Sequence, residues 1–510
     1  MMTQSSDILI TIVGLGPGEA GMLTRDAWEA LTGASVIYLR TQRHPAVAGL
    51  PAGVPIQICD DIYEVTADLS AVYPLIAARI IDAAQTAGGV VYAVPGDPHT
   101  AEASVEMIRM EAGKRGWGVR VLPGVSFVQP VMALLERDVL PNLLLCDALA
   151  FLDLYHPPVS PDVPVLLAQV YSRAVASELK LTLMNQYPEE HLVALVHAAG
   201  TAAVLVEWRP LHAIDHSMEI GHLTCLFVPA LAAGSSFAAL EVTVAHLRSR
   251  AGCAWDREQT HQSLRVTLLE ETYEVLAALD AADPDALREE LGDLLLQVVL
   301  HAQIAVDDGE FQMHAVLRGI NEKLVRRHPH VYGTLKLASA DAVVQHWETI
   351  KAAERRAIGV AVPNSVLAGV PRTLPALAQA QALQARAARV GFDWPAVEPV
   401  LAKVMEELGE VQLAADETQQ FAELGDLLLS VVNWARHLKV DAEAALRVAA
   451  ARFRARFELV EQAARELGRS PAEMTLAELD ALWDQAKVTH RLLASEERDY
   501  VVQPSEAGAH

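Results

Sequence analysis

The sequence has little of what marks secreted, membrane or nucleic-acid-binding proteins. Its 510 residues include only four cysteines, and Cys59, Cys146, Cys225 and Cys253 lie too far apart for a CxxC or zinc-ligand spacing. Basic residues are scarce, because 40 Lys and Arg face 65 Asp and Glu, and a net charge of −25 argues against binding to nucleic acid or anionic membranes. No apolar run is long and charge-free enough to span a bilayer, and the N-terminus lacks the basic region and cleavage site of a signal peptide. We therefore expect a cytoplasmic protein with reduced thiols and no membrane or nucleic-acid partner.

Aromatic residues make up only 5% of a chain that is 52% hydrophobic, so aliphatic side chains must form its cores. Up to about residue 240, strand-like and helix-like segments alternate, which favours an α/β domain with much parallel sheet. From there on almost every segment is helical, and three prolines within residues 357–376 indicate a linker. We expect five parts: an α/β domain at 1–240, helical domains at 241–356 and 377–495, the linker at 357–376, and a disordered tail at 496–510.

Carboxylates interrupt the apolar stripes of two neighbouring helices predicted within residues 268–297. Glu271 falls at helical spacing between Leu268 and Val275, and Glu290 takes the same position in the stripe of the next helix. A carboxylate beside a core costs free energy unless it is paired or holds a cation. For any single Glu, a solvated position on the outer flank is the simpler interpretation, so the recurrence of the pattern decides between the two.

The pattern does recur about 135 residues later, within the sequence VMEELGEVQLAADETQQFAELGDLLLSVV. The acids at 271, 290 and 293 match those at 407, 423 and 426 with offsets of 136, 133 and 133 residues. Basic and aromatic residues match as well, so the helical half is a tandem duplication of one unit. The matched pairs are Glu270/Glu406, Glu271/Glu407, Glu274/Glu410, Glu290/Glu423, Asp293/Asp426, Lys323/Arg452, Arg327/Arg456, Trp347/Trp483 and Lys351/Lys487.

Each copy thus supplies four acids that antiparallel helices would bring together. An all-oxygen cluster suits Mg²⁺ or Mn²⁺ rather than zinc. Carboxylates, Lys or Arg and an aromatic ring are together what a polyphosphate site needs, because the metal and the bases neutralise phosphate charge. The alternative is a bundle in which the Glu side chains pair with Arg, and duplication of the whole set makes it less favoured.

The motif EExxE…ExxD, with WDREQT before it and RRHPHVYG after it, resembles the MazG nucleoside triphosphate pyrophosphohydrolase family over about residues 245–495. The resemblance implies an all-α fold that forms homodimers and a Mg²⁺-dependent cleavage of an NTP to NMP and pyrophosphate. It implies these metal ligands: Glu271, Glu274, Glu290, Asp293, Glu407, Glu410, Glu423 and Asp426. It further implies catalytic roles for Glu270, Glu406, Lys323, Arg327, Arg452 and Arg456, and substrate contacts from Trp347, Lys351, Trp483 and Lys487.

Three glycine-rich turns follow strands in the N-terminal half: VGLGPG, YAVPGDPHTAEASV and VLPGVSFVQ. Each alone is an ordinary tight turn, but together they resemble the tetrapyrrole methylase family over about residues 8–235. The resemblance implies an S-adenosylmethionine site between two α/β subdomains, lined by Gly14, Gly16, Pro17, Gly96, Asp97, Ser126 and Phe127. Because the GDPxxYG extension of many methylases reads GDPHTAEAS here, a methyltransferase and a degenerate binding or scaffolding module both stay open.

The whole chain therefore looks like an α/β methylase-like domain followed by two all-α MazG-like helical domains. The leading hypothesis is a house-cleaning nucleotide hydrolase, in which water activated by Mg²⁺ attacks between the α- and β-phosphates. A methyltransferase with a regulatory or oligomerising helical half is the second hypothesis, and a non-enzymatic nucleotide or metal sensor is the third. The sequence names neither the preferred base nor the active copy, the methyl acceptor or the oligomeric state.

Overall fold

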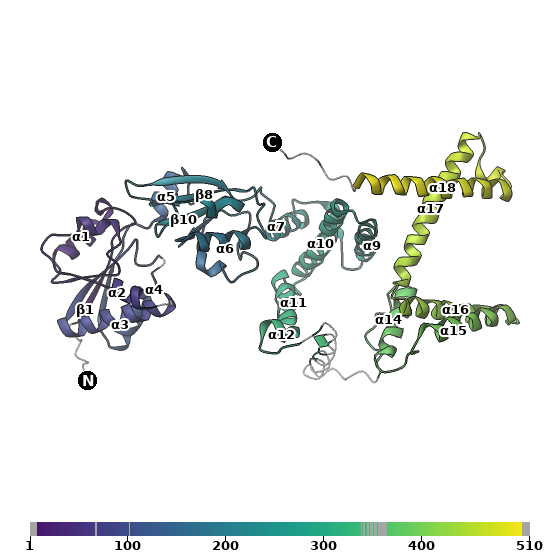
Figure 1. The fold of residues 1–510 in the computed structure, drawn as a ribbon, viewed down its shortest axis with the longest axis horizontal. Helices are drawn as coiled ribbons and strands as arrows, with labels where there is room; N and C mark the ends of the chain where they lie inside the picture. The colour runs from purple at the N-terminus through teal and green to yellow at the C-terminus, as the bar shows by residue number, and fades with distance from the viewer. Residues whose placement is uncertain are drawn as a thin grey trace. The chain divides into compact units, whose positions relative to one another are not determined.

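In the computed structural model the chain forms two compact units. The structure describes residues 8–66, 69–100, 102–337 and 365–501, together with a few single residues between 338 and 364. One unit contains residues 1–265 and 295–310, and the other contains residues 266–294 and 311–510 (Figure 1). The predicted domain limits at residues 240, 356, 376 and 495 remain predictions, because a compact unit is not the same as a repeat.

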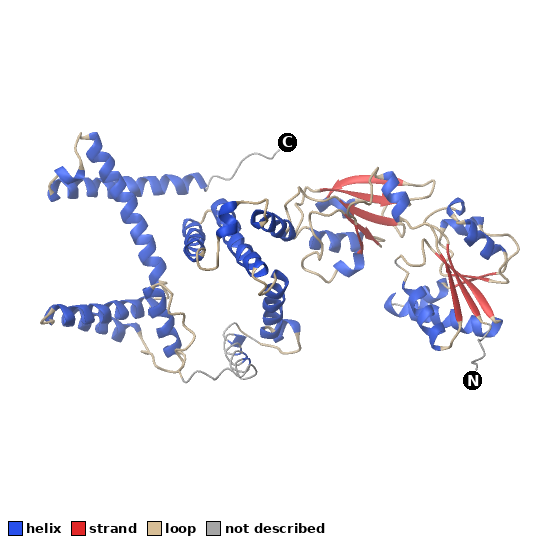
Figure 2. Ribbon diagram, turned by 180° about the vertical axis from the view of Figure 1, so that it is seen from behind, coloured by secondary structure: helices blue, strands red, loops and turns tan. Residues whose placement is uncertain are grey.

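The N-terminal sheet is entirely parallel, as the alternation of strands and helices predicts, and its strand order is β3-β2-β4-β1-β5 (Figure 2). The strands are β1 (Leu9–Gly14), β2 (Ile37–Leu39), β3 (Ile56–Ile58), β4 (Gly89–Val94) and β5 (Gly118–Leu122). The helices are η1 (Ala20–Met22), α1 (Arg25–Thr32), η2 (Pro45–Gly49), α2 (Asp60–Val65), α3 (Leu69–Ala87) and α4 (Ala103–Lys114).

Helices cover both faces of this sheet, which is why its strands are almost continuously apolar. Ile10 and Ile12 of β1 pack in one core with Ile108 of α4. Val13 points to the opposite face and packs in a second core with Leu31 of α1. The period of two along β1 therefore assigns alternate side chains to the two cores, and the loops at the carboxyl ends of the strands are left free to form a site.

The second sheet has the order β6-β7-β10-β8-β9, and only β6 and β7 run parallel. Its strands are β6 (Leu144–Asp147), β7 (Val165–Ala168), β8 (Leu192–His197), β9 (Leu205–Pro210) and β10 (Thr224–Val228). Its helices are α5 (Val128–Leu134), η3 (Ala148–Phe151), α6 (Arg173–Leu183) and η4 (Leu211–His216). Every residue of β7 and β10 is buried, so the cores on the two sides of this sheet share these strands.

After the second sheet, all the regular elements that the structure describes are helices. The first set of helices is α7 (Phe237–Arg248), α8 (Ala254–Glu258), α9 (Arg265–Ala281), α10 (Pro284–Asp307), α11 (Met313–Arg327) and α12 (Pro329–Tyr332). The second set is α14 (Ala376–Ala388), α15 (Val397–Leu413), α16 (Glu417–His437), α17 (Ala442–Glu466), η5 (Pro471–Glu473) and α18 (Leu476–Val501). Within the described residues, no helix is both long enough and apolar enough to cross a membrane.

Helix α18 continues to Val501 and thus extends into the segment 496–510 for which the sequence predicts a disordered tail. The reason is local, because LLASEER consists largely of good helix formers without Gly or Pro. Residues 502–510 lie outside the described part of the chain, as do residues 357–364 of the predicted linker. The rest of that linker precedes α14, which begins at Ala376.

Asp393 ties the segment before α15 to the end of α16. Its carboxylate accepts hydrogen bonds from Arg436 Nη1 at 2.9 Å and pairs with His437 Nε2 at 3.0 Å. The Arg436 guanidinium, with a smaller contribution from His437, lowers the pKa of Asp393 to about 2. Asp393 is therefore a structural tie between the segment before α15 and the end of α16.

Glycines at three strand ends allow the first unit's loops to meet. Gly16 and Gly96 exchange two backbone hydrogen bonds of 3.1 and 2.7 Å. A Cβ on Gly14 would lie 2.6 Å from the backbone nitrogen of Gly124 and 2.7 Å from the carbonyl oxygen of Gly96. Only glycine fits such an approach, so the three glycine-rich turns form one junction.

We predict that Gly14→Ala destabilises the α/β part by about 2 kcal/mol or more, because the added methyl group meets rigid backbone on two sides. Gly113→Ala is the matched control, since no atom lies within 4 Å of its added Cβ in α4. Alanine is the better helix former, so the control should raise stability by up to about 1 kcal/mol. Equilibrium urea denaturation measures both, and equal effects of the two variants would contradict the prediction.

A second prediction concerns the pH dependence of the α15–α16 pair. The pKa of Asp393 is lowered to about 2 in the folded protein, whereas the pKa of an Asp in an unfolded chain is about 3.9. The ionised carboxylate therefore contributes its full stabilisation of the fold above about pH 3.9, and this contribution is lost as the pH falls through about 2. Hydrogen exchange of the α15 and α16 amides measures the free energy of opening of this helix pair. Across this pH window, that free energy should fall by about 1–2 kcal/mol more in the wild type than in Asp393→Asn. Asp480→Asn, at an exposed position of α18, is the control and should follow the wild type. Parallel curves for wild type and Asp393→Asn would refute the assignment.

Candidate functional site

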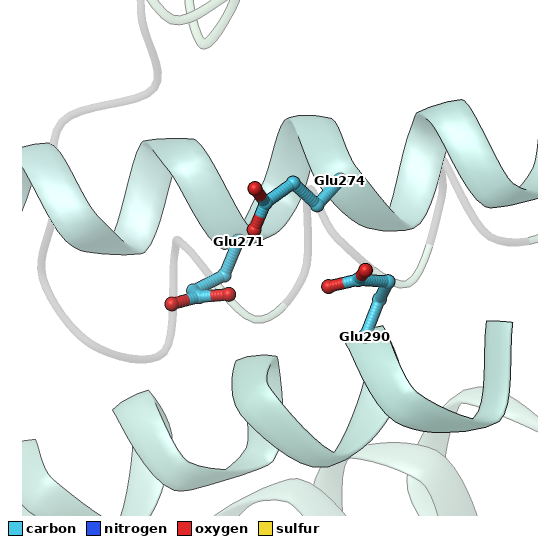
Figure 3. A group of neighbouring side chains, drawn as sticks. All are labelled: Glu271, Glu274 and Glu290. Carbon is cyan, nitrogen blue, oxygen red and sulfur yellow. The ribbon is translucent and has the colours of Figure 1, made fainter. Parts of the chain in front are cut away.

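The first acidic cluster joins α9 and α10. Glu271 and Glu274 lie one turn apart on α9 and project towards the side on which Glu290 rises from α10 (Figure 3). Each of the three offers a carboxylate oxygen, and these oxygens all lie within 4.8 Å of one another. The helical spacing that predicts convergence thus brings together three of the four expected ligands.

Like charges crowd this cluster. Partial desolvation, followed by the charges of Asp293 and Glu274, raises the pKa of Glu271 above its usual value. The pKa of Glu290 is raised by desolvation and then by Glu274 and Asp293. Asp293 therefore acts on the cluster electrostatically, although it is exposed and not one of the three acids whose oxygens meet. Glu270, the additional acid, is exposed on α9.

The second cluster repeats this arrangement on α15 and α16. Oxygens of Glu407, Glu410 and Glu423 again lie within 4.8 Å of one another. Glu407 is only 5% exposed, and desolvation together with the neighbouring Glu407 raises the pKa of Glu410. The predicted fourth ligand, Asp426, is exposed and is again not one of the three.

The donor chemistry of both clusters fits a hard divalent cation. All the donors are carboxylate oxygens, which magnesium and manganese prefer. Within the described residues, Glu407 Oε2 is buried and has no hydrogen-bond partner. A buried oxygen without a partner carries a desolvation cost that a bound cation would offset. The residues present therefore fit Mg²⁺.

Sequence reasoning missed a lysine at the second cluster. Lys403 lies on α15, and its Nζ pairs with Glu406 Oε1 at 2.9 Å and Glu407 Oε1 at 2.7 Å. The i, i+3 and i, i+4 spacings from Lys403 to these acids are visible in the sequence and would have indicated both pairs. Glu406, predicted as an additional acid, is thus engaged in an ion pair.

The predicted basic residues of the first copy are only partly described. Lys323 and Arg327 lie on α11, and Arg327 Nη2 contacts Glu354 Oε2 at 2.6 Å. Arg327, with help from Arg326, lowers the pKa of Glu354 to about 2. The predicted substrate contacts Trp347 and Lys351 lie outside the described residues.

In the second copy the basic and aromatic residues lie on α17 and α18. Arg452 is exposed on α17, and the buried Nε of Arg456 has no hydrogen-bond partner within the described residues. The ring of Trp483 lies 5.1 Å from that of Phe453, and Lys487 pairs with Asp484. The structure describes no ion pair that joins this set to the acidic cluster of α15 and α16.

The first unit contains a chamber of about 580 Å³ beside the glycine junction. Loops that follow strands of the first sheet line it, together with Ala168 of β7, Cys225 of β10 and Tyr171 from the loop after β7. Of the residues expected at a cofactor site, four line the chamber: Pro17, Gly96, Asp97 and Phe127. Three are not among its lining residues: Gly14, Gly16 and Ser126. The two glycines belong to the backbone junction, and Ser126 Oγ accepts a hydrogen bond from Val128 N at 3.3 Å.

Asp97 holds the loops around the chamber in place. One of its carboxylate oxygens accepts a hydrogen bond from Gly124 N at 3.0 Å, and the other accepts one from His99 N at 2.8 Å. The aspartate of the PGDP turn is therefore a link between the ends of β4 and β5. Its position on the chamber wall follows from that link.

The chamber wall also holds a buried ion pair, which sequence reasoning missed. Arg40 Nη1 contacts Glu102 Oε2 at 2.8 Å, and the side chain of Glu102 is only 2% exposed. Ser104 donates to Glu102 at 2.7 Å and lies 2.9 Å from the hydroxyl of Tyr92. Glu102 is the second of the two residues at which GDPHTAEAS departs from the methylase pattern, so this part of the departure builds a buried polar network.

A histidine on the same wall is neutral at physiological pH. Burial, followed by the charge of Arg40, lowers the pKa of His44 to about 4. Its Nδ1 accepts a hydrogen bond from Ala46 N at 3.3 Å, which caps η2. His44 thus stabilises a turn of the chamber wall.

Comparison with known families agrees with the division into two kinds of fold. Residues 9–211 match the model of the tetrapyrrole (corrin/porphyrin) methylases. Residues 259–332, which include the whole first acidic cluster, match the MazG nucleotide pyrophosphohydrolase domain.

Three relatives extend the comparison to the rest of the chain. The uncharacterized protein YabN of Bacillus subtilis is 40% identical over 495 residues, which is 94% of this chain and 99% of that protein. The nucleoside triphosphate pyrophosphohydrolase/pyrophosphatase MazG of Thermotoga maritima is 44% identical over 255 residues, covering 50% of this chain and 97% of its own. The nucleoside triphosphate pyrophosphohydrolase of Escherichia coli is 43% identical over 241 residues, covering 46% of this chain and 90% of its own. The chain thus belongs to the YabN family, which carries a tetrapyrrole methylase domain ahead of a helical half of the MazG family.

Proposed function

We propose that the helical half is a Mg²⁺-dependent nucleoside triphosphate pyrophosphohydrolase that releases NMP and pyrophosphate. The observation that carries the proposal is the cluster of three glutamate side chains from two neighbouring helices, with oxygens within 4.8 Å, which occurs in both copies. The names of the Thermotoga maritima and Escherichia coli relatives support the same activity. The net charge of −25 makes a bound cation the natural way to attract a triphosphate.

The ligands for the metal are Glu271, Glu274 and Glu290 in the first copy and Glu407, Glu410 and Glu423 in the second, with Asp293 and Asp426 beside them. When bound, Mg²⁺ supplies a Lewis-acidic charge for the phosphate oxygens of the substrate. The carboxylates hold this position from two helices, so the charge is placed before the substrate arrives. Glu270 and Glu406 border the clusters and orient water or ligands.

Basic residues then neutralise the charge that the metal leaves on the triphosphate. Arg452 and Arg456 follow each other at i, i+4 on α17 and present guanidinium groups on one side of that helix. Lys323 and Arg327 have the same spacing on α11. The Trp483 ring, held against Phe453, provides an apolar surface for a base or sugar.

The active form is a homodimer through the helical domains. Helices α15 and α16 leave apolar side chains exposed that a single copy does not cover: Leu401, Leu408, Leu424, Leu428 and Leu429. Several exposed leucines on two neighbouring helices are typical of an interface. Pairing with a second copy would bury it and keep water away from the carboxylate clusters.

A double substitution tests the two clusters together. Glu271→Ala combined with Glu407→Ala should lower Mg²⁺-dependent pyrophosphate release from a panel of NTPs by about 100-fold or more, because each cluster loses its half-buried or buried ligand. Glu258→Ala combined with Glu458→Ala, both at exposed positions outside the clusters, is the control and should keep the wild-type rate. Circular dichroism establishes that the helices persist. Unchanged turnover in the first double variant would refute the proposal, and the two single variants assign the active copy.

The chamber of the first unit favours a second candidate function, an S-adenosylmethionine-dependent methyl transfer. A volume of about 580 Å³ lies within the usual range for small-molecule sites. Glycine-rich turns after strands of the first sheet and residues of β7 and β10 line it, which suits a nucleoside with an amino-acid tail. The chamber residues bind and enclose the cofactor. Glu102, which pairs with Arg40, stands at the position of the glycine in the GDPxxYG extension of many methylases.

We predict that the full-length chain binds S-adenosylmethionine by isothermal titration calorimetry and that Tyr171→Ala weakens this binding about tenfold, because Tyr171 lines the chamber. Tyr155→Ala is the matched control, since Tyr155 is 94% exposed and is not a lining residue. Equal affinities for the two variants, or no heat with the wild type, would leave the chamber without this cofactor. Either result leaves the hydrolase proposal intact.

A further inference from the structure

The two acidic clusters differ in one charge. In the second cluster, Nζ of Lys403 lies 2.7 Å from Glu407 Oε1, and the lysine side chain is 34% exposed. Lysine and glutamate lie on the same helix at i, i+4, so the contact needs no movement of another element. The pairing raises the pKa of Lys403, chiefly through its hydrogen bonds to Glu407 and Glu406, and the lysine is charged at every physiological pH.

The first cluster contains no such lysine. With the offset of 136 residues that relates Glu271 to Glu407, the position of Lys403 corresponds to Thr267. Among the described residues, no ion pair engages Glu271, Glu274 or Glu290. The charges that act most strongly on Glu271 are all negative. In the part of the chain that the structure describes, the three carboxylates of the first cluster thus have no ion-pair partner, whereas the second cluster has one ammonium group against its three.

The second cluster is also the more deeply placed. Glu407 uses Oε1 for Lys403, and its buried Oε2 has no hydrogen-bond partner within the described residues. Lys403 therefore provides a partner for one oxygen of the Glu407 carboxylate and leaves the other without one. A divalent cation that uses both oxygens must therefore first separate Lys403 from Glu407.

We propose that Lys403 is a built-in counter-ion of the second cluster, which a divalent metal must displace, and that its absence from the first cluster gives the two copies unequal metal affinities. The inference rests on the proposed metal-dependent function and adds a residue that tunes it. Displacement also frees an ammonium group beside the bound metal, where a phosphate of the substrate would be its next partner.

Manganese titration followed by electron paramagnetic resonance tests the proposal without any enzymatic reaction. In the full-length chain, Glu271→Gln with Glu274→Gln disables the first cluster, so that Mn²⁺ reports on the second. Lys403→Gln in this background should tighten Mn²⁺ binding about tenfold, because a positive charge within about 4 Å of the metal position is removed. Lys403→Arg keeps the charge and should stay within about twofold of the parent.

The reciprocal variant uses the duplication itself. In a chain whose second cluster is disabled by Glu407→Gln and Glu410→Gln, Thr267→Lys installs the counter-ion at the first cluster. Mn²⁺ binding there should weaken about tenfold, and Thr267→Gln, of similar length without charge, should not change it. Circular dichroism of each variant monitors the fold.

The outcomes separate this inference from the proposed function. The counter-ion role is wrong if Lys403→Gln leaves the Mn²⁺ affinity unchanged or has the same effect as Lys403→Arg. It is also wrong if the parent shows no Mn²⁺ binding and Lys403→Gln does not produce any. In each of these cases the metal site still stands, as long as the chain with both clusters intact binds Mn²⁺. If that intact chain binds no Mn²⁺, the metal site of the proposed function is itself wrong. Binding that becomes measurable only after Lys403→Gln supports the inference.

Discussion

Repulsion between carboxylates held close together is the constraint on which the helical half depends. Glu271, Glu274 and Glu290 lie on the neighbouring helices α9 and α10, and one oxygen from each comes within 4.8 Å of the others. Partial desolvation, followed by the neighbouring negative charges, raises the pKa values of Glu271 and Glu290. A fold that keeps such an arrangement twice has a use for concentrated negative charge. The second copy relieves part of it with Lys403, so the duplicated unit has diverged in its electrostatics while its backbone pattern has been kept.

Much of this architecture follows from periodicity. Apolar spacing of three and four places Glu271 and Glu290 on facing stripes, and the alternation of strands and helices predicts the parallel order around β1. The glycine-rich turns are related in the sequence only through the methylase resemblance, and the structure brings them together in the Gly14–Gly96–Gly124 junction. The second sheet is different, because only β6 and β7 are parallel and the pairing of β8, β9 and β10 depends on contacts between distant segments that no local pattern encodes.

The site was predictable where one helix face or one turn determines it and not where several elements meet. The spacing of the acids predicts four ligands in each cluster, but only three of them meet, and Asp293 and Asp426 are not among those three. Ser126 belongs to a motif of the cofactor loops and yet caps its own turn, because its hydroxyl is satisfied locally. Lys403 is a different case. Its i, i+4 spacing to Glu407 is visible in the sequence, so this ion pair was predictable although it was not predicted.

The buried pair of Arg40 and Glu102 has a consequence for how the α/β domain can change during evolution. Glu102 is 2% exposed, so replacing it alone leaves a guanidinium in the chamber wall without its countercharge, and replacing Arg40 alone leaves a carboxylate stranded. Either single step passes through a less stable protein. The two positions are therefore expected to change together among relatives. A lineage that has one residue of the pair is expected to keep the other as well.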